Sequence, residues 1–170
     1  KEKVIYTIGC SKVVPEIIEE NNATPIREKV GHSFVNAHMI NQKALFGIEH
    51  TGHYFYRDNF YTESAMITSL LICEFLSSKD IKISKVIEPL KRYYTTGEVS
   101  FRVKNREEVL ARLKSSLGCS SYHCKMDLFD GLHLDCGNYW FRIRASQTES
   151  LIRFQVEGVS EKEIKIAKEM

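Results

Sequence analysis

The segment Gly47–His53 gathers side chains that could bind a sugar. A carboxylate (Glu49), a hydroxyl (Thr51) and two imidazoles lie within five positions, directly after an apolar run. A carboxylate can accept hydrogen bonds from two neighbouring sugar hydroxyls, and hydroxyl and imidazole groups can donate or accept as needed. Gly52 permits the turn that points these groups together. Taken alone, the same segment could be an ordinary solvated loop.

A second segment, residues 142–153, is dense in groups that bind phosphate. It contains three arginines together with Ser146, Gln147 and Thr148. Guanidinium groups hold phosphate oxygens in pairs, and hydroxyl, amide and backbone N–H donors complete an anion site. The segment has too few glycines for a Walker-type loop. The alternative is a surface hairpin whose arginines pair with Glu149, which would contribute little.

Together these segments resemble the α-D-phosphohexomutases of the phosphomannomutase/phosphoglucomutase kind. The Gly47–His53 segment is similar to the sugar-specificity loop of their third domain, and Arg144–Glu149 resembles the phosphate loop of their fourth domain. Three further stretches also match family elements, namely Val30–Ser33, Tyr54–Asp58 and Phe129–Leu132. The resemblance covers nearly the whole chain and places it in the C-terminal part of such an enzyme.

The resemblance implies an intramolecular phosphotransferase of the isomerase class. Such an enzyme interconverts hexose 1-phosphate and hexose 6-phosphate through a phosphoserine and a bisphosphorylated sugar, here with glucose or mannose phosphates. The residues that match sugar-binding positions are Gly31, His32, Glu49, Thr51 and His53, and His53 is also the candidate for proton transfer. The residues that match phosphate-binding positions are Arg144, Ser146, Gln147, Thr148 and Arg153.

The resemblance also shows what this chain lacks. The family's nucleophilic serine and its magnesium-binding aspartates belong to earlier domains, and neither motif occurs here. We therefore expect Mg²⁺ in the full-length enzyme, bound outside this chain, no cofactor in the fragment, and no catalysis by the fragment alone. The alternative is a stand-alone sugar-phosphate-binding or regulatory module without catalysis. Gly9, which stands where the family usually has a basic residue, modestly favours that alternative.

Composition narrows the choice of partners. With 43% hydrophobic and 27% charged residues, the 170-residue chain is typical of globular proteins. Its 24 basic and 22 acidic side chains are interspersed, which indicates neither nucleic acid nor a membrane surface as partner. The apolar run Ala65–Leu76 is too short to cross a bilayer, and we expect a buried helix there. The expected partners are hexose phosphates and the missing N-terminal domains of the same protein.

Five cysteines without a C-x-x-C pair indicate reduced thiols and a cytoplasmic location. Cys119, His123 and Cys124 could supply zinc ligands, but zinc usually takes four, and no second paired set follows. We therefore predict no metal site in this chain.

The elements that must position these loops form two domains. Residues 1–80 alternate strands and helices, which predicts an α/β sugar-binding domain, the family's domain 3, incomplete at its N-terminus. Expected strands are Val4–Ile8, Pro25–Val30 and Ala44–Ile48. Expected helices are Val13–Glu20, Phe34–Ile40 and Glu63–Leu76, the last one capped by Asp58 or Asn59.

Residues 81–170 predict the phosphate-binding C-terminal domain, the family's domain 4. Several short strands in a row favour an antiparallel sheet with helices on one face. Expected strands are Val99–Val103, Met126–Phe129, Leu132–Asp135, Tyr139–Ile143 and Leu151–Val156. Expected helices are Ile83–Tyr93, stopped by Thr95–Gly97, then Arg106–Leu117, and a closing helix that begins with a capping box at Ser160.

Overall fold

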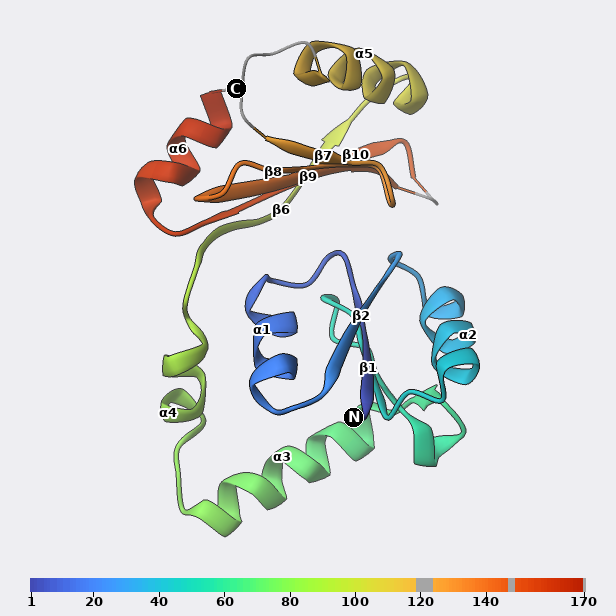
Figure 1. Ribbon diagram of the computed structural model, residues 1–170, viewed down its shortest axis with the longest axis vertical. Coiled ribbons are helices and arrows are strands. Elements are labelled where there is room, and N and C mark those ends of the chain that lie inside the picture. The colour runs from blue at the N-terminus through green and yellow to red at the C-terminus, as the bar shows by residue number, and fades with distance from the viewer. Residues whose placement is uncertain (119–123, 147–148, 170) are drawn as a thin grey trace. The chain divides into compact units, whose positions relative to one another are not determined.

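The structure, a computed structural model, describes residues 1–118, 124–146 and 149–169 (Figure 1). It divides into two compact units, Lys1–Arg92 and Tyr93–Met170. The expected boundary between residues 80 and 81 falls between two helices of the first unit.

The first unit is a five-stranded sheet with helices around it, as the strand and helix alternation predicts. Its strands lie in the order β2-β1-β3-β4-β5. Three are parallel, namely β1 (Lys3–Thr7), β2 (Thr24–Glu28) and β3 (Phe46–Ile48), while β4 (Tyr54–Tyr56) and β5 (Thr62–Glu63) add antiparallel pairs. The helices are α1 (Val13–Glu20), α2 (His32–Gln42), α3 (Ala65–Lys79) and α4 (Ile83–Ile87), with 3₁₀ turns at Arg57–Asn59 and Glu88–Leu90.

Helices α1 and α2 lie on opposite faces of this sheet (Figure 1). The chain moves from β1 outward to β2 and then back past β1 to β3, and right-handed crossovers in opposite directions place their helices on opposite sides. On the α2 side, Val35 and Met39 pack with Ile5 and Phe55 in a fully buried cluster. The carboxyl ends of β1 and β3 are therefore a topological switch point, where such sheets bind ligands.

Helix α3 corrects one expectation, because it is not buried. The exposed fractions of its apolar side chains include 75% for Met66, 64% for Leu70 and 47% for Phe75. The apolar residues cover most of its circumference, so one neighbouring sheet cannot bury them all. Its N-cap is Ser64, whose Oγ accepts from Ile67 N–H at 3.2 Å, rather than Asp58 or Asn59, which lie in a 3₁₀ turn.

A groove of about 810 Å³ runs along this helix within the first unit. Apolar side chains of α3, α4 and strands β3 and β4 line most of it, among them Phe46, Tyr54, Leu71, Phe75 and Ile87. Helix α4 is shorter than the expected Ile83–Tyr93 because Pro89 cannot continue a helix. None of the helices in the described parts of the chain is long and apolar enough to cross a membrane.

The second unit is an antiparallel sheet in the order β6-β10-β9-β8-β7, with two helices on one side (Figure 1). Both features confirm the prediction. The strands are β6 (Tyr94–Arg102), β7 (Lys125–Asp127), β8 (Leu132–Asp135), β9 (Tyr139–Ala145) and β10 (Leu151–Gly158), and the helices are α5 (Arg106–Gly118) and α6 (Glu161–Glu169). Residues 95–97, the expected helix stop, lie inside β6 instead.

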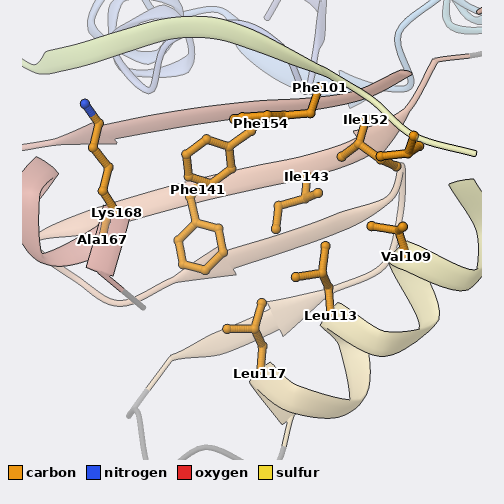
Figure 2. A pocket seen from close by; sticks show the side chains of 11 residues that line it. Phe101, Val109, Leu113, Leu117, Phe141, Ile143, Ile152, Phe154, Ala167 and Lys168 are labelled. Carbon is orange, nitrogen blue, oxygen red and sulfur yellow. The ribbon is translucent and has the colours of Figure 1, made fainter. Parts of the chain in front are cut away.

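The core of this unit lies between the sheet and its helices. Phe141 and Ile143 of β9 pack with Ile152 and Val156 of β10 and with Ile164 of α6. Figure 2 shows side chains of α5 and the sheet around a cavity of about 360 Å³ in this layer. Because side chains alternate along a strand, the residues between these apolar ones lie on the face opposite the helices.

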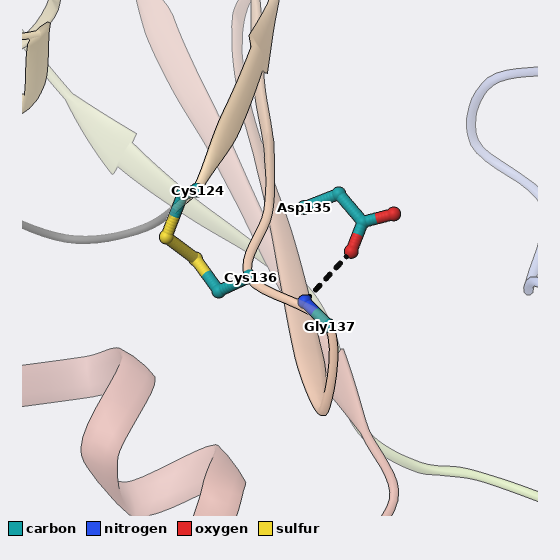
Figure 3. Close-up of a disulfide and its surroundings, with 4 residues drawn as sticks. All are labelled: Cys124, Asp135, Cys136 and Gly137. Carbon is teal, nitrogen blue, oxygen red and sulfur yellow. Dashed lines mark hydrogen bonds between the residues drawn. A yellow bond between two sulfur atoms is a disulfide. The ribbon is translucent and has the colours of Figure 1, made fainter.

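A disulfide corrects the expectation of reduced thiols. Cys124 and Cys136 are bonded across the ends of β7 and β8 (Figure 3). The strand register explains why, because Lys125 pairs with Asp135 and the two cysteines are the next opposed residues. Beside them, Asp135 Oδ1 accepts a hydrogen bond from Gly137 N–H at 2.9 Å, which forms the turn. Cys119 and His123, the other candidate zinc ligands, lie outside the described residues.

Candidate functional site

The loops after β1 and β3 meet at the carboxyl edge of the first sheet. A Cβ atom at Gly9 would lie within 3.0 Å of three ring atoms of His50. From the same loop, Cys10 Sγ contacts the carbonyl oxygen of Ile48 at 3.8 Å. The space that a larger residue at position 9 would need therefore holds the imidazole of His50, which gives a packing reason for glycine there.

Glu49 is the buried carboxylate of this edge, with an exposed fraction of 5%. Its Oε2 accepts from Thr51 Oγ1 at 3.3 Å, and its Oε1 has no hydrogen-bond partner among the described residues. The loop is closed by two backbone hydrogen bonds, from Glu49 N–H to the His53 carbonyl and from Gly52 N–H to the Glu49 carbonyl. A buried carboxylate oxygen without a donor is costly, so this oxygen is suited to accept from a ligand hydroxyl.

His53 lies at the exposed end of the same loop. Its Nδ1 forms a hydrogen bond with Glu63 Oε2 on β5, which leaves Nε2 as the ring nitrogen available for proton exchange. Sequence reasoning missed Glu63. It is distant from His53 in the sequence, and the pairing of β4 with β5 brings the two residues together. Gly31 is the N-cap residue of α2 and has a positive φ of 146°. The centre of the His32 ring lies 4.8 Å from that of the Phe55 ring.

The second unit holds an arginine cluster on the sheet face opposite its helices. We define it as Arg142, Arg144, Arg153 and the carboxylate of Glu98. Glu98 Oε1 accepts from Arg153 Nη1, and its Oε2 lies 3.6 Å from Arg142 Nη2 and 3.8 Å from Arg144 Nη2. Arg142 and Arg144 have exposed fractions of 5% and 7%. Three guanidinium groups thus surround one carboxylate in a largely buried setting.

The loop after β9 continues from this cluster. Ser146 is buried, and its Oγ accepts from Glu149 N–H at 3.3 Å. Arg106, at the start of α5, donates from Nη1 to the carbonyl oxygens of Ser146 and Glu149 and so holds both sides of the loop. Gln147 and Thr148, two of the residues expected to bind phosphate, lie outside the described residues.

The hairpin at Phe129–Leu132 supports Arg144 from the neighbouring strand. Gly131 has a φ of 87°, and a Cβ atom there would lie within 3.0 Å of the Ile143 carbonyl oxygen and of Arg144. Asp127 Oδ1 accepts from Phe129 N–H at 2.8 Å and shapes the turn. Only glycine combines this backbone conformation with so close an approach to β9.

The structure therefore groups the sequence candidates into two sets. Glu49, Thr51 and His53 lie in one loop of the first unit, and Arg144, Ser146 and Arg153 lie together in the second. Sequence reasoning missed Glu98 and Arg106 as members of the second set, and it included Arg142 in the phosphate-friendly segment without giving it a role of its own. Among residues 1–118, 124–146 and 149–169, no three potential metal ligands converge, so no metal is assigned to them.

Comparison with known proteins identifies the family. Residues 1–93 match the family described as phosphoglucomutase/phosphomannomutase, alpha/beta/alpha domain III. The chain belongs to this phosphohexomutase family. Its resemblance in sequence is thereby confirmed, and it corresponds to domain III and the domain that follows.

Two relatives within the phosphohexomutase family illustrate the extent of the match. The chain is 32% identical over 163 residues to a phosphomannomutase of Methanocaldococcus jannaschii, covering 96% of this chain and 35% of the relative. It is also 32% identical over 156 residues to proteins named phosphohexose mutases in Xanthomonas campestris, covering 91% of this chain and 34% of theirs. The chain thus spans about a third of the length of the curated relatives it matches.

Solved phosphohexomutase structures share the fold. A phosphoglucomutase/phosphomannomutase family protein of Burkholderia thailandensis matches with a TM-score of 0.83 at 21% identity, covering 99% of this chain and 36% of that one. An N-acetylphosphoglucosamine mutase of Aspergillus fumigatus, solved with GlcNAc-6P and magnesium, matches with a TM-score of 0.67 at 14% identity. It covers 98% of this chain and 37% of the fungal protein.

Proposed function

We propose that this chain is the substrate-recognising part of a phosphomannomutase/phosphoglucomutase that interconverts hexose 1-phosphate and hexose 6-phosphate. In this role Glu49, Thr51 and His53 contact the sugar, while Arg144 and Ser146 hold the phosphate that is not being transferred. Gln147, Thr148, Gly31, His32 and Arg153 complete the proposed site. The observation that carries the proposal is the buried Glu49 carboxylate, whose Oε1 has no hydrogen-bond partner among the described residues.

The chemistry divides between this chain and the rest of the proposed enzyme. A carboxylate that accepts two hydrogen bonds recognises a pair of hydroxyls, and so can hold the sugar in either of its two orientations. Buried guanidinium groups hold a phosphate in place without reacting with it. We assign the phosphoserine, the bisphosphorylated intermediate and Mg²⁺ to other domains of the proposed enzyme, because the serine and aspartate motifs of the family do not occur in this sequence.

The apolar groove along α3 supports a partner within the same protein. Leu71, Ile72 and Phe75 line this groove and are exposed, and apolar surface of this kind usually marks an interaction site. The chain also spans only about a third of its relatives. Both observations favour a longer protein whose preceding domains pack against this surface.

Titration of the chain with glucose 1-phosphate tests the proposed function. We expect chemical-shift changes of the amides of both Thr51 and Ser146, because the ligand carries both a sugar and a phosphate. Arg144→Ala should weaken binding by about 1–3 kcal/mol through loss of charge-assisted hydrogen bonds, measured by isothermal titration calorimetry. Glucose without phosphate serves as the control ligand, since it should perturb Thr51 only.

Two outcomes would count against the proposal. Unchanged affinity in the Arg144→Ala variant would show that this arginine does not hold the phosphate. An absence of shifts at Thr51 at saturating glucose 1-phosphate would show that the Gly47–His53 loop does not recognise the sugar. Binding confined to the phosphate loop would favour a module that senses phosphate without reading the hexose.

A further inference from the structure

On the arginine face of the second sheet, polar residues line up across neighbouring strands. Glu98 of β6 is opposite Gln155 of β10, which is opposite Arg142 of β9. In the adjacent row, Arg153 of β10 is directly opposite Arg144 of β9. Arg142 and Arg144 are two positions apart on β9 and so share one face. Arg142 therefore occupies the same surface as the proposed phosphate-binding residue.

The guanidinium group of Arg142 is oriented by one hydrogen bond and one ion pair. Its Nη2 donates to Gln155 Oε1 at 2.9 Å and lies 3.6 Å from Glu98 Oε2. Arg144 Nη2 lies 3.8 Å from that same oxygen. Because both guanidinium groups approach the same oxygen of Glu98, they lie next to each other on this sheet face. Such an arrangement presents two planar, oriented donors side by side.

Glu98 pairs with all three arginines, but two other features of the arrangement are costly to folding, which points to a role outside stability. Like charges directly opposite each other on neighbouring strands are destabilising, and Arg144 and Arg153 form such a pair. The Nε atoms of Arg144 and Arg153 are buried and have no hydrogen-bond acceptor among the described residues. The free-energy cost of burying cationic donors without acceptors is offset when an anion binds to them.

We propose that Arg142 is a second guanidinium contact for the ligand's phosphate and extends the phosphate site along β9 from Arg144. This inference rests on the proposed function and deepens it. The two adjacent guanidinium groups fit a phosphate dianion better than a monoanion, since each supplies one positive charge and a fork of N–H donors. The site thus selects ligands whose anionic group carries two charges.

Affinities for glucose 6-phosphate and glucose 6-sulfate test this selection. The two ligands differ in the charge that they carry at the same position of the sugar. The ratio of their affinities therefore reports on the positive charge of Arg142. Arg142→Leu should bind glucose 6-phosphate about tenfold more weakly, the scale of one charge-assisted hydrogen bond, and glucose 6-sulfate less so. Arg142→Gln keeps a polar side chain but loses the charge, and should change the ratio of the two affinities in the same way. Isothermal titration calorimetry of the wild-type chain and the two variants measures the six affinities.

Arg112→Leu is the matched control, because it removes one arginine from the exposed side of α5 in the same unit. Its affinities should equal those of the wild type. If Arg142→Leu binds both ligands as the wild type does while Arg144→Ala has lost glucose 6-phosphate, the inference is wrong and the proposed function stands. If the Arg142 variants weaken both ligands equally, Arg142 acts only on structure and the inference is wrong. If the wild type binds neither ligand, both proposals fail.

Discussion

In the first unit the candidate binding groups lie in loops beyond the ends of parallel strands, whereas in the second most of them lie along the strands of an antiparallel sheet. Glu49 is held by hydrogen bonds within its own loop, since its carboxylate accepts from Thr51 and its N–H donates to the His53 carbonyl. The arginine cluster is instead held by Glu98, which belongs to a distant part of the sequence. The second site therefore couples binding to folding stability more strongly than the first.

The largest expected effect is the loss of Glu98. Glu98→Ala removes the carboxylate that three guanidinium groups share, and should lower the free energy of unfolding of the second unit by about 3 kcal/mol. Urea unfolding measures this through the fluorescence of Trp140, the chain's single tryptophan, which lies on β9.

Glu149→Ala is its control, because this carboxylate pairs with Arg153 while 55% of its side chain is exposed. The cost of this change should be less than about 1 kcal/mol. Equal losses in the two variants would mean that the arginine cluster is not organised by Glu98.

The next largest effect is loss of the disulfide, which should change the stability of the second unit and not that of the first. Replacing both Cys124 and Cys136 by serine should lower the stability of the second unit by about 2–3 kcal/mol, because the bond closes a short loop in the unfolded chain. The Trp140 transition should shift, and amide exchange in the first unit should not. Cys73→Ser is the control, since Cys73 is a free and exposed cysteine. An unchanged Trp140 transition in the double variant would refute a stabilising disulfide.

Gly131 tests how the hairpin supports Arg144. Gly131→Ala should cost more than about 2 kcal/mol, because the new Cβ adds a clash with the β9 backbone to the strain of a positive φ. Gly137→Ala shares the positive φ of 84° but meets no atom within 4 Å, so it should cost only about 1 kcal/mol. Thermal unfolding compares the two. Equal costs would show that the approach of Gly131 to β9 does not matter.

The smallest effect is electrostatic and lies in the first unit. Arg92 donates hydrogen bonds to Glu20 of α1 and lowers the pKa of that carboxyl below its ordinary value of 4.5. A lowered pKa contributes stability that is present above 4.5 and is lost as the pH falls through the lowered folded value.

Arg92→Leu should therefore slightly flatten the acid dependence of α1 stability, followed by its amide resonances between neutral and acidic pH. Lys85→Leu, which removes an exposed pair with Glu88 on the neighbouring short helix, is the control. A wild-type acid profile in the Arg92 variant would exclude this contribution.

Local pattern explains why much of the fold could be predicted. The expected helix Val13–Glu20 agrees with α1 in its bounds, and the capping box at Ser160 predicted α6, where Ser160 Oγ accepts from Glu163 N–H at 3.3 Å. Helix α3 was recognised as a helix but wrongly expected to be buried. Periodicity reports the apolar circumference of a helix, and it cannot report whether neighbours are present to cover it.

The sites divide in the same way. The residue types and spacing of Gly47–His53 and Arg144–Glu149 determined the candidate loops, because each lies in one short stretch of sequence whose groups need only a turn to converge. Glu98, Arg106 and the disulfide partner of Cys124 were decided only by the tertiary structure. They are brought to their places by strand pairing and helix packing between distant segments, and no local pattern encodes which strands become neighbours.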